Sequence, residues 1–172
     1  MRICGVDVGI RNTRLAVIEL GRLIYLGEPG NLQCGVCAVD APLTYGVPFR
    51  DCDREIMKMG IPIMPLNLPF MRQIHERALA LIPTLACDEV FEVYPYATRR
   101  ILGFAFDKRS KRGRKAIFDA LSKYLNMKLE RIPDEHELDA ITAALTALLY
   151  LEGRGRFLGR KCRILIPDYD VI

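Results

Sequence analysis

The stretch RICGVDVGIRNTRLAVIEL, residues 2–20, predicts two β-strands and the turn that joins them. Residues 2–8 and 14–20 are rich in Val, Ile and Leu, whereas residues 9–13 carry the Gly and Asn that favour a turn. A third apolar run follows at residues 23–26. Together the three runs predict an antiparallel meander of three strands.

Asp7 is the most informative residue of the first run, because a carboxylate inside an apolar strand is costly to desolvate unless a cation or hydrogen-bond donors meet it. Gly5 and Gly9 stand two residues away on either side. This spacing clears side chains from the same face of the strand and leaves room for a metal ion or a phosphate. The alternative is that Asp7 only caps the turn that follows.

Two later apolar runs each place one acidic residue near the end of an expected strand. Residues 35–41 (GVCAVDA) contain Asp40, and residues 89–93 (EVFEV) contain Glu92. If both strands lie parallel to the first, their carboxyl ends meet at the edge where open α/β sheets build their sites.

The rest of the chain is expected to be mainly helical. Helices are predicted at residues 51–59, 70–82, 115–125 and 134–151, with an irregular segment at 60–69 and a late strand at 163–166.

Asp139 lies in the second turn of the long predicted helix, at the border of its buried stripe. A helix packed across the sheet would bring Asp139 to Asp7 and complete an acidic cluster. Such clusters bind hard cations through oxygen, so Mg²⁺ or Mn²⁺ is the expected occupant. Two ions about 4 Å apart would suit phosphodiester hydrolysis without a protein nucleophile. His136 is expected either to assist as an acid or base or to face solvent.

Basic residues gather between residues 99 and 115, although the formal net charge is only +4. Such a cluster suits a polyanion such as nucleic acid, and the alternative is a solvated loop. The basic residues expected to contact the substrate are Arg11, Arg54, Arg99, Lys108, Arg109, Lys111 and Arg112.

The length of 172 residues, with 51% apolar and 27% charged residues, predicts one globular domain over residues 1–172. We find neither a signal peptide nor a run near the roughly 20 apolar residues of a membrane span, so we expect a cytoplasmic protein without a membrane partner. Most of the six cysteines are interpreted as small, buried residues in a reducing compartment rather than as a disulfide framework, with Cys34 and Cys37 as the exception. Cys34 and Cys37 form a C-x-x-C motif, but a structural zinc site would need a second pair. The oligomeric state is left open, with a homodimer as one alternative.

Several short motifs follow one another along the chain in an order that is typical of one family. They are Gly5-Val6-Asp7, Ala38-Val39-Asp40-Ala41-Pro42, Arg50-Asp51-Cys52-Asp53-Arg54-Glu55, Glu92-Val93-Tyr94-Pro95 and Leu138-Asp139-Ala140. In this order, and over nearly the whole chain, the sequence resembles the uncharacterised DUF 429 family, predicted nucleases of the RNase H-like superfamily.

The resemblance implies an α/β fold with a mixed five-stranded sheet in the order 3-2-1-4-5, strand 2 antiparallel, and helices on both faces. It also implies metal-binding acids on strand one, strand four and the last helix, positions matched by Asp7, by Asp40 or Glu92, and by Asp139. Residues 110–113 (SKRG) look like a further family element, which favours substrate contact by the basic cluster. One departure is that only residues 27–34 separate the third strand from the fourth, where such proteins usually have a helix.

These observations predict a divalent-metal-dependent nuclease that hydrolyses phosphodiester bonds in DNA or RNA. Asp7, Glu92 and Asp139 are the expected metal ligands, Asp40 is a further catalytic acid, and Asp40 and Glu92 compete for the second ligand position. One alternative is a non-catalytic RNase H-like module that binds nucleic acid or protein. Another is a phosphotransferase of the actin and sugar-kinase type, although the chain lacks the second glycine-rich phosphate loop of such enzymes.

Overall fold

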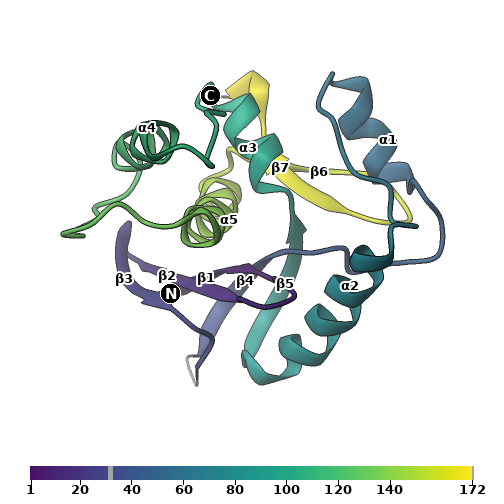
Figure 1. The fold of residues 1–172 in the computed structure, drawn as a ribbon, viewed down its shortest axis with the longest axis horizontal. Helices are drawn as coiled ribbons and strands as arrows, with labels where there is room; N and C mark the ends of the chain where they lie inside the picture. Colours follow the sequence, from purple (N-terminus) through teal and green to yellow (C-terminus); the bar gives the residue numbers. More distant parts are fainter. Residues whose placement is uncertain (31–32, 172) are drawn as a thin grey trace.

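A mixed β-sheet with strand order β3-β2-β1-β4-β5-β7-β6 runs through the computed structural model, which describes residues 1–30 and 33–171 (Figure 1). β1 pairs antiparallel with β2 and parallel with β4, and β5 and β7 continue in the parallel direction. The strands are β1 (Arg2–Asp7), β2 (Arg14–Glu19), β3 (Arg22–Gly27), β4 (Cys34–Asp40), β5 (Cys87–Val93), β6 (Gly155–Leu158) and β7 (Ile164–Pro167).

Helices cover both faces of the sheet. α5 (Glu135–Leu151) lies across β1, β2 and β4, and α4 (Lys111–Leu121) packs outside it (Figure 1). α2 (Pro69–Leu81) covers the opposite face, where its Ala78 joins a buried cluster with Val6 and Val39. The remaining helices are α1 (Asp51–Lys58), α3 (Pro95–Ile101) and two single turns of 3₁₀ helix at Ile82–Thr84 and Tyr169–Val171. None of the helices in the described ranges is long and apolar enough to cross a membrane.

α5 approaches β1 closely because Gly5 has no side chain. A Cβ atom at residue 5 would lie 2.0 Å from the carbonyl oxygen of Ala140 and 2.3 Å from the amide nitrogen of Ala144. The helix begins at a capping box, in which Asp134 accepts a hydrogen bond from the amide of Glu137 and the Glu137 side chain accepts one from the amide of Asp134. Gly5 thus lets α5 lie directly against the strand that carries Asp7, and the capping box sets the residue at which the helix begins.

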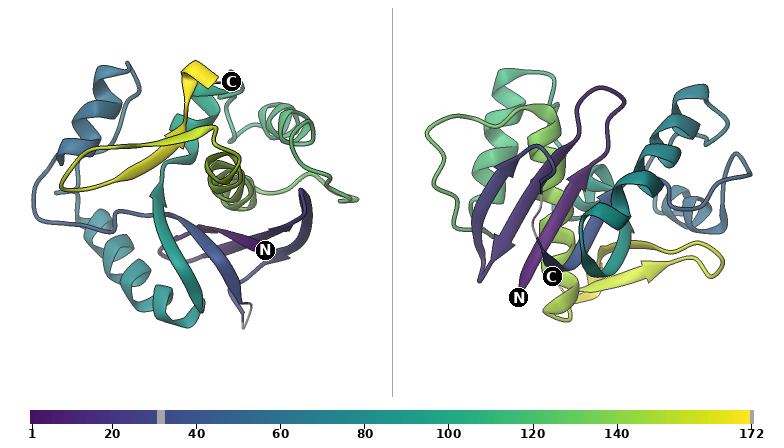
Figure 2. Two further views of the ribbon diagram at one scale, coloured as in Figure 1. Left: turned by 180° about the vertical axis from the view of Figure 1, so that it is seen from behind. Right: turned by 90° about the horizontal axis from the view of Figure 1, so that it is seen from below.

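The predicted strand order 3-2-1-4-5, with strand 2 antiparallel and helices on both faces, is present, but the sheet has seven strands rather than five. β7 corresponds to the late strand expected at 163–166, whereas β6 and α3 were not anticipated. β6 is only four residues long, and α3 begins at Pro95, two residues after the strand expected at 89–93. Proline fits the first turn of a helix because its missing N–H has no intrahelical partner there. Figure 2 shows the β6–β7 hairpin beside α1, at the far end of the sheet from β3.

The connection between β3 and β4 spans residues 28–33, of which residues 31 and 32 lie outside the described part. β3 and β4 both run parallel to β1 without pairing with each other, because β2 and β1 lie between them in the sheet. Residues 27–34 are the connection predicted from the sequence, and the structure ends β3 at Gly27 and begins β4 at Cys34.

The interpretation of the cysteines as free thiols is wrong for this structure, which pairs all six. The disulfides are Cys4–Cys34, Cys37–Cys87 and Cys52–Cys162, with Cα–Cα distances of 6.0, 6.0 and 5.7 Å. These separations are within the usual range for bonded cysteines. The pairs join residues 30 to 110 positions apart, so spacing along the chain gave no sign of them.

Candidate metal centre

Three carboxylates meet at the carboxyl edge of the parallel strands. Asp7 is the last residue of β1, Asp40 is the last residue of β4, and the two are directly opposite in the parallel ladder. Asp139, one turn into α5, adds the third carboxylate, and one oxygen from each residue lies within 4.8 Å of the others. Asp7 and Asp139 are buried, whereas Asp40 is half-buried. The structure therefore brings three of the four expected acids together.

His136 holds the Asp7 side chain in place. Its Nδ1 lies 2.6 Å from Asp7 Oδ2, and both residues face the same pocket. The hydrogen bond to Asp7 raises the pKa of His136. Burial raises the pKa of Asp7, an effect that the hydrogen bond from His136 opposes. The sequence left two alternatives for His136, a residue that assists at the site or one that faces solvent. The contact with Asp7 places His136 at the acid cluster.

Asp139 is held by two cations from different elements. Arg99 Nη1, on α3, donates to Asp139 Oδ1 at 2.6 Å and to Thr142 Oγ1 at 3.3 Å. Lys108 Nζ contacts the other carboxylate oxygen of Asp139. Arg99 is 3% exposed and its Nε has no hydrogen-bond partner among the described residues, whereas the Lys108 side chain is 34% exposed. Arg99 is therefore a fixed internal counter-ion, and Lys108 is the cation that can reach solvent.

Asp40 is the carboxylate with the least favourable surroundings. Burial, and then the charges of Asp7 and Asp139, raise the pKa of Asp40 well above its ordinary value. A divalent cation would relieve this repulsion, because it attracts all three carboxylates at once. The set of oxygen donors fits Mg²⁺ or Mn²⁺, which prefer carboxylate ligands.

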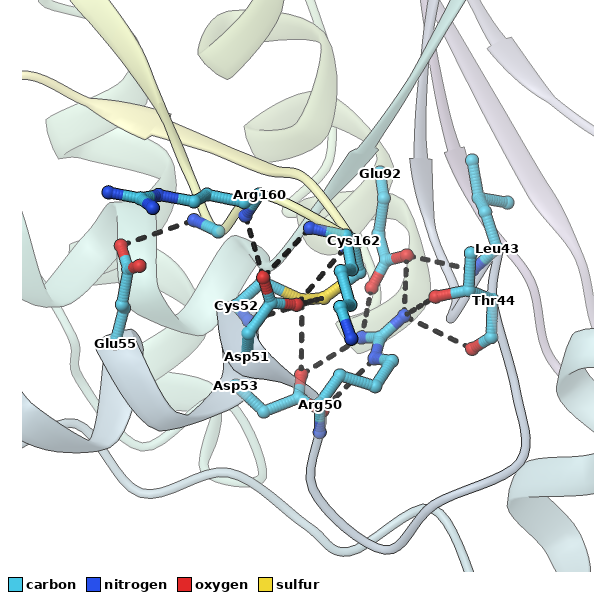
Figure 3. The surroundings of a disulfide bond; sticks show 12 residues. Leu43, Thr44, Arg50, Asp51, Cys52, Asp53, Glu55, Glu92, Arg160 and Cys162 are labelled. Atoms are coloured by element: carbon cyan, nitrogen blue, oxygen red, sulfur yellow. Dashed lines mark hydrogen bonds and ion pairs between the residues drawn. A yellow bond between two sulfur atoms is a disulfide. The ribbon is translucent and has the colours of Figure 1, made fainter.

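Glu92 lies outside the acid cluster, where its carboxylate is paired with the guanidinium of Arg50 (Figure 3). Its two carboxylate oxygens accept hydrogen bonds from Arg50 Nη1 at 2.9 Å and Nη2 at 2.5 Å, and Oε2 also accepts one from the amide of Leu43 at 2.8 Å. The same guanidinium binds Asp53, which is fully buried, and the oxygens of Thr44. Glu92 thus anchors the segment after β4 and the start of α1.

The alternation of side chains along a strand explains this separation. Glu92 is opposite Val39, not Asp40, in the β4–β5 ladder. Val39 belongs to the buried cluster on the α2 face, so Glu92 points to that face, whereas Val93 packs with the α5 side. The structure therefore does not bring Glu92 into the cluster of Asp7 and Asp139, where the sequence interpretation had placed it.

A pocket of about 790 Å³ opens onto the acid cluster. Asp7, Asp40 and Asp139 line it, and so do Lys108 and Arg109 from the loop before α4. Four of the other basic residues expected to contact the substrate are exposed but do not line the pocket. Arg11 is in the β1–β2 turn beside the pocket residue Ile10, and Lys111 and Arg112 are at the start of α4. Arg54 is on α1. Arg99 is at the pocket but is bound to Asp139.

The backbone is similar to that of RuvC. A structure of Thermus thermophilus RuvC aligns with 89% of this chain and 97% of its own, at 15% sequence identity and a TM-score of 0.47. A structure of T. thermophilus RuvC in complex with Holliday junction substrate aligns with 89% and 96% of the two chains, at 16% identity and a TM-score of 0.48. No family model matches this chain, and no curated protein sequence does.

Several pocket residues had no role in the sequence interpretation. Arg50, Tyr94, Tyr96 and Phe106 all line the pocket, together with an apolar group from residues 63–74. Phe106 offered one signal, because it stands within the basic cluster as an aromatic residue two positions before Lys108. The others reach the pocket through contacts between distant elements, which a single sequence does not reveal.

Proposed function

We propose that this protein is a divalent-metal-dependent nuclease with an RNase H-like core that hydrolyses phosphodiester bonds in nucleic acid. The observation that carries the proposal is the convergence of Asp7, Asp40 and Asp139 at the carboxyl edge of the parallel strands. These three residues would hold Mg²⁺ or Mn²⁺, with Asp40 rather than Glu92 in the second position. A bound ion supplies Lewis-acid stabilisation of the charge that develops at the phosphate during hydrolysis.

The protein's own side chains prepare the site for an anionic substrate. His136 fixes the orientation of Asp7, and Arg99 fixes that of Asp139 through a short buried ion pair. Arg109 is exposed at the pocket, and the partly exposed Lys108 would be released from Asp139 when the carboxylate oxygen that it contacts binds a metal ion, so we assign both to the phosphates on either side of the cleaved bond. Arg11, Lys111 and Arg112 extend this basic surface outside the pocket.

The direct test is cleavage of labelled single-stranded, duplex and branched DNA and of RNA, with and without Mg²⁺ or Mn²⁺. Asp7→Asn should lower the metal-dependent cleavage rate by at least about 100-fold. Removal of a residue that only hydrogen-bonds to a metal ligand already costs up to about 100-fold, and Asp7 is a proposed ligand itself. Asp88→Asn is the matched control, because Asp88 is an exposed carboxylate on β5 outside the pocket. Equal cleavage by Asp7→Asn and wild type would refute the proposal. Binding of nucleic acid that persists in EDTA, with no cleavage of any substrate, would favour the non-catalytic module.

A further inference from the structure

The pocket at the acid cluster has a second, apolar wall that the hydrolysis of a phosphodiester does not require. Ile63, Met64, Leu66, Met71 and Ile74 line it, from the segment before α2 and from α2 itself. Tyr94 and Tyr96 also line the pocket. A volume of about 790 Å³ exceeds the space that a metal ion and one phosphate fill, and it lies within the range of pockets that bind whole organic ligands.

Several polar groups beside this wall are already engaged in contacts within the protein. Tyr94 Oη donates to the carbonyl oxygen of Pro62 at 2.9 Å, which ties the segment before α2 to the end of β5. Arg50 and Glu92 also line the pocket, but their polar atoms bind each other, Asp53 and Thr44. The wall thus presents apolar surface and aromatic rings to the pocket rather than a pattern of donors and acceptors that would read the edge of a base.

Two side chains at the pocket remain open to solvent although they are large and apolar. Met64 is 53% exposed and Phe106 is 50% exposed. Phe106 precedes Lys108 and Arg109 in the same loop, so an aromatic ring and two cations stand together. Flat aromatic groups stack on phenyl rings and contact the polarisable sulfur of methionine favourably. Aromatic side chains beside cations are the combination by which proteins bind single-stranded nucleic acid without reading its sequence.

We infer that the apolar wall binds an unpaired nucleobase of the substrate strand while the phosphate beside it lies at the acid cluster. This inference rests on the proposed nuclease function and names its substrate class: a strand that is unpaired at the cleaved position. A base within a duplex has both faces covered by its stacked neighbours, so it cannot pack against the apolar wall. Phe106 stacks on the base or its neighbour, and Lys108 and Arg109 bind the backbone.

The experiment measures binding and cleavage separately. Fluorescence anisotropy in the cleavage-deficient Asp7→Asn background, in Mg²⁺, compares a labelled single strand, the same strand in a duplex, and a series of strands that each lack one base at a different position. We expect the single strand to bind about 10-fold more tightly than the duplex, and one abasic position to weaken binding about 10-fold, in line with the cost of losing one stacked base.

Met64→Ser and Phe106→Ala should each weaken binding of the intact single strand about 10-fold. Met64→Ser should also remove the difference between the intact and the abasic strand. Both residues are half exposed, so the fold should tolerate the changes, and a thermal melt checks this. Leu79→Ser is the matched control, because Leu79 is 48% exposed on α2 outside the pocket lining.

The outcomes separate the inference from the function on which it rests. If the wild type cleaves duplex and single strand equally well, and neither Met64→Ser nor Phe106→Ala changes binding or cleavage, the base-binding wall is overturned while the nuclease stands. If the wild type cleaves no substrate but retains single-strand binding that depends on Met64, the nuclease proposal fails and the base-binding wall is supported.

Discussion

Exchange of Glu92 for Gln should lower the stability of the protein without weakening its affinity for Mg²⁺. The Glu92 carboxylate is buried and accepts hydrogen bonds from Arg50 at 2.5 and 2.9 Å and from the amide of Leu43 at 2.8 Å. Loss of one partner of a buried ion pair costs about 3–5 kcal/mol. Because Arg50 keeps Asp53 as a partner, we expect the lower end, about 3 kcal/mol. For a domain of this size that corresponds to a fall in Tm of about 6–12 °C.

Asp40→Asn should have the opposite effects. Asp40 lies among the carboxylates of Asp7 and Asp139, and its raised pKa reflects burial and their repulsion. Removal of its charge should therefore leave the Tm in EDTA unchanged or higher, while Mg²⁺ affinity falls by more than about 100-fold.

Calorimetry in EDTA gives the Tm of each variant, and isothermal titration with Mg²⁺ gives the affinity. The assignment of roles is refuted if Glu92→Gln loses Mg²⁺ binding at an unchanged Tm while Asp40→Asn binds Mg²⁺ like the wild type. Glu92 would then be a metal ligand despite its ion pair with Arg50.

Three further predictions concern the framework around the site. Gly5→Ala should destabilise the protein by at least about 3 kcal/mol, the upper end for overpacking, because the new Cβ would lie 2.0 Å from the carbonyl oxygen of Ala140; a urea midpoint equal to that of the wild type contradicts this. Replacement of Cys52 and Cys162 by Ala should cost about 2–4 kcal/mol in urea unfolding under oxidising conditions, since the bond closes a loop of 110 residues, and an unchanged midpoint means that the bond is absent in solution. Asp51 accepts hydrogen bonds from the amides of residues 160–162, which lower its pKa, so its stabilising effect is present above the ordinary value of 3.8 and is lost as the pH falls through the lowered pKa. The stability gap between wild type and Asp51→Asn should therefore narrow on acidification, and a gap that is constant with pH argues against this role.

The sequence predicted the strands that carry the site because each is an apolar run with a single acid near its carboxyl end. The observed strands end at Asp7 and Asp40, one residue before the predicted ends, and the capping box at Asp134 and Glu137 marks the start of the helix that carries Asp139. These are local signals, and local signals survive in a single sequence.

The misplacement of Glu92 has a different cause. Its strand was predicted, but the face to which a side chain points depends on pairing with the neighbouring strand. The pairing of Glu92 with Val39 is a contact between residues far apart in the chain, and so are the ion pair with Arg50 and the three disulfides. None of these long-range contacts leaves a periodic pattern in the sequence. The short strand β6 and helix α3 were missed because each is too short for a clear period.

The disulfide between Cys4 and Cys34 has a consequence for the spacing of the acids. It joins β1 to the start of β4, the two strands whose ends place Asp7 opposite Asp40. A slip of one residue between these strands would move Asp40 by about 3.3 Å along β1 and turn its side chain to the other face. The covalent bond resists such a slip, so heat or denaturant that loosens the sheet should not change which carboxylates meet. The pairing of Asp7 with Asp40 is thus protected by a covalent bond between the middle of β1 and the first residue of β4.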